Sequence, residues 1–155
     1  MRSRLCFISI LLLLFLCSAM GYKFLWQGDV APASDGRIAI QMPAAERDLV
    51  LNEMRGFLQA VQMILSAADR EEMELLAGSA RQAGMAAGDG MPGSLVGRLP
   101  MGFKKLGFDT HQRFDQLALD AEQLGDPQHS LQQLAELMTN CVSCHATYRI
   151  DILEE

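Results

Sequence analysis

The apolar residues of this chain follow two patterns, a continuous run near the N-terminus and a series of helical stripes after it. The run extends almost unbroken from Leu5 to Met20 and goes on through aromatic residues to Trp26. It predicts an apolar helix within residues 1–26. Beyond residue 42, apolar side chains recur every three or four residues in four separate segments. This period is typical of amphipathic helices, and we expect no strand.

The four stripes predict an all-α fold. Pro43 suits the first turn of the first helix, and Asp69 and Glu72 have the spacing of a capping box at the start of the second. The breakers Gly125-Asp126-Pro127 end the third. The expected helices cover about residues 43–68, 69–87, 99–124 and 128–149. Because their connections are mostly short, we expect an antiparallel four-helix bundle within residues 43–155.

The N-terminal segment has the features of an export signal, because Arg2 and Arg4 precede a run without charge. The stretch Leu5–Trp26 has 22 residues, enough to cross a hydrocarbon core, which favours a retained membrane anchor. The small residues of Cys17-Ser18-Ala19 keep a cleaved signal peptide as the alternative. In both cases the folded part lies outside the cytoplasmic membrane. Residues 27–42, rich in Gly, Pro, Ala and Asp, are expected to be a linker.

The charge of the remaining chain is strongly acidic. From Gln27 onward there are 10 Lys and Arg against 19 Asp and Glu, a formal charge of −9. This balance argues against a nucleic-acid partner. It suits a domain that faces water or a basic partner surface.

The last stripe contains Cys141-Val142-Ser143-Cys144-His145, a C-x-x-C-H sequence typical of c-type haem attachment. On a helix these positions share one face, so two thioether bonds and an imidazole can address one flat porphyrin. A zinc site would need two more ligands, and a thioredoxin-like pair would be expected near a βαβ pattern. The other cysteines, Cys6 and Cys17, lie in the apolar N-terminal segment. We therefore expect one haem c, attached at Cys141 and Cys144, with His145 on the iron.

The tail C-V-S-C-H-A-T-Y-R on the last helix of such a bundle resembles the cytochrome c-prime family and its low-spin relatives, the class II c-type cytochromes. The resemblance covers about residues 43–149. It implies one haem per chain and a place in the bacterial periplasm. Dimers formed through the first two helices are frequent in the family, so a homodimer is an option for this chain, although nothing in the sequence demands one. It also implies that Tyr148 packs beside the ring. Arg149 would pair with a haem propionate, or would otherwise be a charge at the helix end in water.

The resemblance also points to the ligand opposite His145. In the low-spin branch a Met of the first helix binds the iron and suits it to electron transfer. Met54, followed by Arg55, resembles that ligand turn, and we expect it to be the second metal ligand. In the other branch the position is open and binds NO or CO. His111, expected at the edge of the apolar face and partly exposed, is a weaker alternative. The poorer methionine candidates are Met42, Met63 and Met138.

These observations predict a monohaem cytochrome that carries single electrons and is not an enzyme. It would exchange electrons with periplasmic or membrane redox partners from the periplasmic side of the bacterial inner membrane. It would be anchored there, or soluble if the N-terminal segment is cleaved. The alternatives are a five-coordinate, gas-binding protein of the cytochrome c-prime kind and a haem-stabilised structural module.

Overall fold

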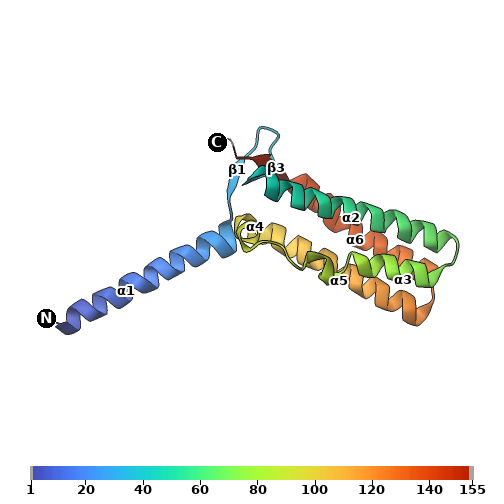
Figure 1. Ribbon diagram of the computed structural model, residues 1–155, viewed down its shortest axis with the longest axis horizontal. Coiled ribbons are helices and arrows are strands. Elements are labelled where there is room, and N and C mark those ends of the chain that lie inside the picture. Colours follow the sequence, from blue (N-terminus) through green and yellow to red (C-terminus); the bar gives the residue numbers. More distant parts are fainter. Residues whose placement is uncertain (1, 154–155) are drawn as a thin grey trace.

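The computed structural model describes residues 2–153, and the protein is mostly helical (Figure 1). The apolar N-terminal helix is confirmed and projects away from the rest of the molecule as a long rod. Its stretch Cys6–Gln27 is long and apolar enough to cross a membrane. Within residues 2–153 the six α-helices are α1 (Arg2–Gly21), α2 (Ala44–Asp69), α3 (Met73–Gln82), α4 (Gly93–Arg98), α5 (Met101–Leu124) and α6 (Pro127–Thr147). Two short helices, the π-helix η1 (Tyr22–Gln27) and the 3₁₀-helix η2 (Met85–Gly88), and three strands complete the structure of this range.

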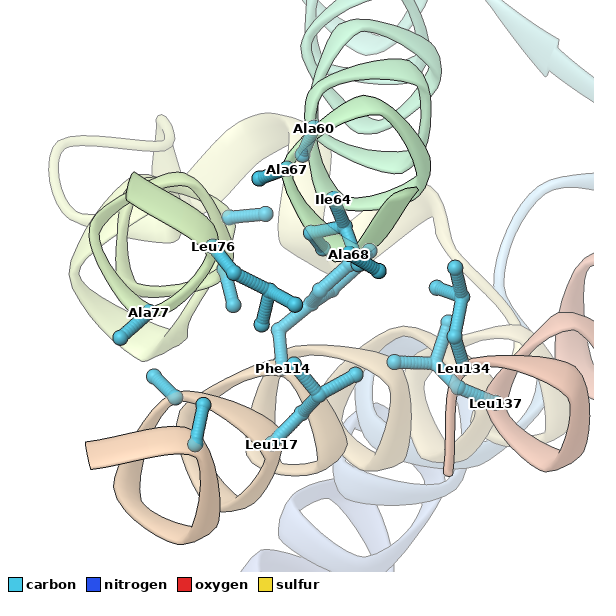
Figure 2. Packing of buried hydrophobic residues seen from close by; sticks show 14 residues of the cluster. Ala60, Ile64, Ala67, Ala68, Leu76, Ala77, Phe114, Leu117, Leu134 and Leu137 are labelled. Atoms are coloured by element: carbon cyan, nitrogen blue, oxygen red, sulfur yellow. The ribbon is translucent and has the colours of Figure 1, made fainter. Parts of the chain in front are cut away.

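Four of the helices, α2, α3, α5 and α6, share one hydrophobic core (Figure 2). Helix α3 packs against α2 and α5, and α6 packs against α5. The core is rich in alanine, so the helices approach closely at the end of the body far from α1. Phe114 and Leu117 of α5 lie fully buried among these small side chains. The fully buried members with large side chains are Ile64, Leu76, Phe114, Leu117, Leu134 and Leu137.

The helix ends follow the sequence signals in most places. Asp126 caps α6, since its carboxylate accepts hydrogen bonds from the backbone N–H groups of Gln128 and His129. Gly125 ends α5 with a φ of 61°, a left-handed conformation that glycine adopts at little cost. The capping box expected at Asp69 is wrong. Helix α2 runs through Asp69, and the backbone N–H of Glu72 still bonds to the carbonyl of Ala67.

The structure contains a small sheet where no strand was expected. Strands β1 (Val30–Pro32) and β2 (Ile38–Met42) form an antiparallel hairpin within the segment expected to be a linker. Strand β3 (Tyr148–Ile152) pairs in parallel with β2, with Ile38 opposite Tyr148. Each strand has at most five residues, too few for an alternating pattern to stand out in the sequence. The last helix therefore ends at Thr147, and Arg149 lies in a strand instead of at the helix end.

The sheet covers a second hydrophobic cluster at the end of the body where α1 joins (Figure 1). Ile40 and Met42 of β2 are fully buried there with Val50 of α2 and Leu95 of α4. Phe103 and Tyr148 pack against them. The helical body is thus closed by alanine-rich packing at one end and by the sheet at the other.

We predict that Phe114→Ala destabilises the protein by about 3–5 kcal/mol, because it removes a fully buried ring from a close-packed core. Phe108→Ala on the same helix is the matched control. Its ring is 55% exposed, and we expect a change within about 0.5 kcal/mol. Urea unfolding of the detergent-solubilised full chain, followed by circular dichroism, measures both. Equal losses would contradict the assignment of Phe114 to the core.

Candidate functional site

The C-x-x-C-H sequence occupies the last two turns of α6. Cys141 and Cys144 are half-buried, and His145 is exposed. Next to Cys141, the side-chain amide of Asn140 donates hydrogen bonds to Asp109 (2.7 Å) and Thr110 (3.3 Å) of α5. These bonds hold this part of α6 against α5.

The two sulfurs face a cavity of about 440 Å³ between α2, α5 and α6. Met54 of α2 and His145 of α6 line the same cavity, so the structure brings together four side chains that the sequence singled out. Exposed apolar side chains lie among the lining residues, including Leu58, which is 70% exposed. Exposed apolar side chains around a hollow are typical of ligand sites. The other apolar lining residues are Leu51, Phe57, Val61, Phe103, Leu106 and Met138.

A second cavity of about 240 Å³ adjoins the first and has a different chemistry. Three arginines line it: Arg37 of the β1–β2 turn, Arg47 of α2 and Arg149 of β3. We call the two cavities together the recess, because Met54, Cys144 and His145 line both. The recess is therefore apolar between the helices and basic at the sheet.

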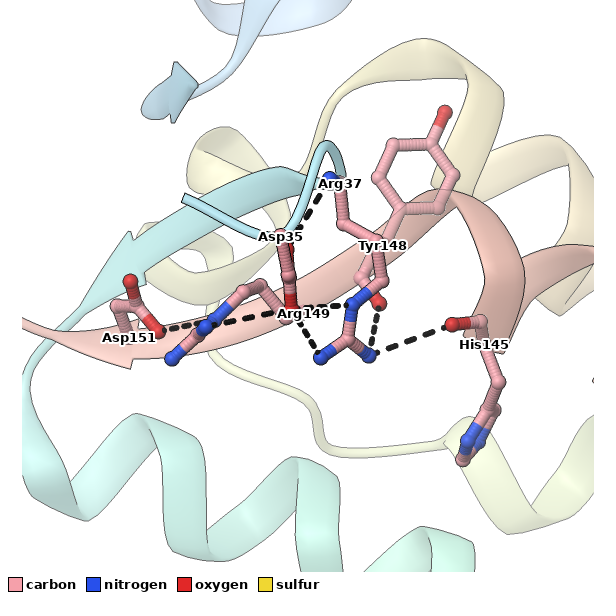
Figure 3. A network of polar contacts seen from close by, with 6 residues as sticks. All are labelled: Asp35, Arg37, His145, Tyr148, Arg149 and Asp151. Carbon is pink, nitrogen blue, oxygen red and sulfur yellow. Dashed lines mark hydrogen bonds and ion pairs between the residues drawn. The ribbon is translucent and has the colours of Figure 1, made fainter. Parts of the chain in front are cut away.

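Two of these arginines, Arg37 and Arg149, belong to a network of ion pairs around Asp35 (Figure 3). The guanidinium of Arg37 donates two hydrogen bonds to Asp35, at 2.9 and 2.7 Å, and Arg149 approaches the same carboxylate at 3.4 Å. The hydrogen bonds from Arg37 lower the pKa of Asp35 to about 2. Arg149 also pairs with Asp151 at 2.8 Å. Arg37 and Arg149 thus meet two carboxylates, and Arg47 pairs with Asp48 on its own helix. None of these carboxylates lines the second cavity, whereas all three arginines do.

Arg37 also joins the sheet to the motif itself. Its guanidinium donates to the backbone carbonyls of His145 (3.3 Å) and Tyr148 (3.4 Å). These carbonyls lie at the C-terminal end of α6, where intrahelical donors run out. Figure 3 shows the imidazole of His145 extending away from the arginine network. The backbone of His145 is therefore fixed while its ring stays available.

Tyr148 begins β3 and packs edge-on against Phe103 of α5, with ring centroids 5.6 Å apart at an angle of 78°. Burial raises the pKa of its hydroxyl. The hydroxyl lies so close to Gly102 that a Cβ at that position would collide with it. Tyr148 therefore forms a wall of the basic cavity and is held there by two residues at the start of α5.

His111 differs from its prediction. It is only 7% exposed, although we expected it to be partly exposed. Its Nδ1 lies 2.9 Å from the Ala83 carbonyl and its Nε2 lies 3.3 Å from Glu53, so both ring nitrogens have acceptors. Burial by itself lowers the pKa of His111. The hydrogen bonds to Glu53 and to backbone carbonyls raise this pKa by more, so the net shift is upward. A ring held on both nitrogens is a poor iron ligand, although it lines the cavity and packs on Phe57.

The thiols of the motif are not activated. Burial raises the pKa of Cys141, and it raises that of Cys144 to about 11, with a further contribution from the nearby Cys141. Reactive dithiols of the thioredoxin kind have lowered pKa values, commonly at helix N-termini. Here both sulfurs lie near the C-terminal end of a helix, where the dipole disfavours a thiolate. This environment argues against a redox-active dithiol.

The arrangement suits a flat ring better than a single ion. Over residues 2–153, no three or more His, Cys, Asp or Glu side chains converge as the ligands of one ion would. The two sulfurs and the imidazole are instead spread along one face of α6, at the edge of a recess that also holds the Met54 thioether. Thioether attachment at a ring edge and axial ligation of a central iron need such a separation.

In comparisons with known proteins, no family model, no curated protein and no solved structure matches this chain. The site therefore has to be understood from its own residues.

All six residues chosen from the sequence line the recess: Met54, Cys141, Cys144, His145, Tyr148 and Arg149. Sequence reasoning missed Arg37, which approaches His145 only because β2 pairs with β3. No local signal marks it, since it is 108 positions from His145 in the chain. Arg47 precedes Met54 by about two helical turns, a spacing that could have placed it on the same side of α2.

We predict that, in the chain without an attached group, Cys144 reacts with iodoacetamide at pH 8 roughly a hundredfold more slowly than an ordinary thiol, because so little thiolate is present. The rate should rise with pH until it levels near the pKa of about 11. Peptide mass spectrometry resolves each cysteine, and the urea-unfolded chain is the control in which the difference disappears. Fast alkylation at neutral pH would instead support a redox-active dithiol.

Proposed function

We propose that this protein is a monohaem c-type cytochrome that carries single electrons, with His145 and Met54 as the axial ligands of a low-spin iron. The observation that carries the proposal is the recess, which puts a C-x-x-C-H sequence and a thioether on an apolar cavity with a basic end. Haem c has an apolar macrocycle, two thioether links and two carboxylates. The residues present fit each of these parts.

The apolar part of the recess would receive the macrocycle, with Cys141 and Cys144 forming the covalent links. Phe57, Phe103 and the aliphatic side chains around them would exclude water from the ring. A low-dielectric surrounding of this kind is one of the means by which proteins set a haem potential. The bound group would supply one-electron chemistry, and the protein would supply its position, its axial ligands and its charge environment.

Met54 is half-buried on α2, across the cavity from α6, and borders both parts of the recess. A thioether ligand opposite a histidine raises the reduction potential of haem iron and suits it to electron transfer. Met138 lines the same cavity but belongs to α6, the helix that already carries His145. The position of Met54 on a facing helix therefore favours it as the ligand.

The basic end of the recess would receive the two haem carboxylates. Arg149 was the candidate for this role in the sequence, and the structure adds Arg37 and Arg47 beside it. Arginine binds carboxylates through two parallel hydrogen bonds, which orient the group as well as attract it. Asp35 and Asp151 already pair with Arg37 and Arg149, so the haem carboxylates would compete with or extend an existing network.

The remaining parts of the proposal follow from the fold. The helices α2, α3, α5 and α6 would form the antiparallel four-helix bundle of class II c-type cytochromes, with the haem between α2, α5 and α6. Helix α1 and η1 would be a retained anchor that keeps the protein on the periplasmic side of the bacterial inner membrane. Its partners would be membrane or periplasmic redox proteins, and the role is that of a carrier and not of an enzyme.

We predict that the full chain, produced in a host competent for haem maturation, has a Soret band and keeps its haem under denaturing conditions. The ferric spectrum should show the charge-transfer band of methionine sulfur, and Met54→Ala should abolish that band and open the iron to CO in the ferrous state. Visible spectroscopy of the purified variants measures both effects.

Met138→Ala is the matched control, since it removes another methionine from the same cavity and should leave the band in place. A wild-type protein that already binds CO rapidly would instead support the gas-binding alternative. A chain that keeps both thiols of the motif free in such a host would contradict haem attachment altogether.

We also predict that Arg37→Gln lowers the reduction potential, because a positive charge near the haem carboxylates favours the reduced iron. A fall of roughly 20–60 mV is expected, where 59 mV is a tenfold change for one electron. Redox titration measures it. Arg149→Gln should act in the same direction, whereas Arg81→Gln, whose side chain pairs with Glu122 away from the recess, should leave the potential unchanged. A rise in potential for Arg37→Gln would contradict the assignment.

A further inference from the structure

All three lysines of the chain lie at one place in the structure. Lys23 belongs to η1, and Lys104 and Lys105 belong to the first two turns of α5. Every other cation is an arginine or a histidine, and the chain from Gln27 onward has a formal charge of −9. We call Lys23, Lys104, Lys105 and the neighbouring Trp26 the collar. Lysine is thus confined to the junction between the apolar rod and the folded body (Figure 1).

One lysine of the collar fixes the rod to the body. The ammonium of Lys104 donates to the backbone carbonyls of Phe24 (3.0 Å) and Leu25 (3.3 Å). These carbonyls lie near the end of η1, where no intrahelical donor follows and where the helix dipole is negative. Burial lowers the pKa of Lys104, as expected for an ammonium enclosed between two elements.

The connection after η1 is equally close. Asp29 accepts a charged hydrogen bond from Arg98 (2.7 Å), and its own N–H donates to the Arg98 carbonyl (2.7 Å). Gly28 has a φ of 70°, and a Cβ there would lie 2.7 Å from backbone atoms of Leu99 and Pro100. The segment that follows η1 therefore packs on the turn between α4 and α5 through backbone contacts, so α1 and η1 are not connected to the body by a flexible linker.

The two other lysines keep exposed charge beside aromatic side chains. Lys105 is exposed, and its ammonium lies 5.9 Å from the centroid of the Trp26 ring. The Lys23 side chain is 47% exposed and pairs with Asp29 at 2.9 Å. Tyr22, Phe24 and Trp26 are all more than half exposed around them. Aromatic rings with nearby cations at the end of an apolar span are typical of the boundary between membrane and water.

The opposite end of the body is acidic. The turn between α2 and α3, together with the helix residues that flank it, carries Asp69, Glu71, Glu72 and Glu74 against Arg70. A negatively charged surface would attract the collar and repel this turn, so both ends favour the same orientation.

From these observations we propose that the collar binds the phosphates of anionic phospholipids, so that the body stands on the membrane with the sheet and the recess at its lipid-facing end. The proposal rests on the retained anchor and does not depend on the haem. Anionic lipid is the occupant that charge complementarity selects, since the collar is the one place where lysine gathers in a strongly acidic chain and it lies at the C-terminal end of the apolar span, where Lys23 and Trp26 belong to the last two turns.

Lysine acylation of the full chain tests this proposal, because each of the three lysines can be followed by mass spectrometry. The protein is inserted in vesicles of phosphatidylcholine, with or without phosphatidylglycerol. In vesicles that contain phosphatidylglycerol, we expect Lys105 to be acylated about fivefold more slowly than in phosphatidylcholine alone. This factor corresponds to the free energy by which an anionic surface attracts one lysine, about 1 kcal/mol. High salt should remove the protection by screening. Lys104 should be slow in both vesicles because its ammonium is bonded to η1.

Two controls show whether the protection is specific to the collar and whether it is independent of the haem. The lysine introduced by Arg70→Lys, at the acidic turn, should react equally in both vesicles. A Cys141→Ser/Cys144→Ser chain should give the same footprint as the wild type, so a failure of the haem proposal would leave this one intact. Equal rates for Lys105 in both vesicles would overturn it. Fast acylation of Lys104 would also overturn it, because it would mean that η1 is not bound to α5. A mature protein that begins after residue 26 would overturn it as well.

Discussion

The parallel pairing of β2 with β3 is the contact on which the arrangement of the site depends. It joins residues 38–42 to residues 148–152, and so it brings the hairpin turn with Arg37 to the end of α6. Without it, Arg149 would be a charge at a helix end, and Tyr148 would have no reason to pack on Phe103. A single long-range pairing thus converts a helical body with a cysteine motif into a recess with a distinct basic end.

The space for the recess arises from unequal packing along the helices. Alanines at 60, 67, 77, 80, 118 and 121 let the helices meet closely far from α1. At the other end Ile40, Met42 and Leu95 form a separate cluster under the sheet. Between these two clusters α2, α5 and α6 do not fill the interior with large side chains, and the cavity forms there. This hollow, with a thioether and two thiols on its wall, is the space that the proposed haem would occupy.

The sequence predicted the parts of this structure that depend on local pattern. The stripes of α2, α5 and α6 and the breakers around Gly125 were visible, because helix period and glycine conformation are local properties. The capping box at Asp69 failed since Asp69 is the last residue of α2 and not the residue that precedes α3. Sequence reasoning could not predict the strands, the role of Arg37 or the burial of His111, and the reason is the same for all three. Each depends on a partner far along the chain: β3 for β2, His145 for Arg37, and Glu53 and Ala83 for His111.

The separation of 108 positions between Arg37 and His145 has a kinetic consequence. Contacts between distant parts of a chain form late, since a long loop must close before they stabilise anything. The alanine-rich helix packing is more local and should form first, leaving the sheet side of the motif open for a time. The proposed haem would then have access to the motif from that side until β2 and β3 pair. In such an order of events, the pairing of β2 with β3 would complete the folding of the chain and the enclosure of its prosthetic group in the same step.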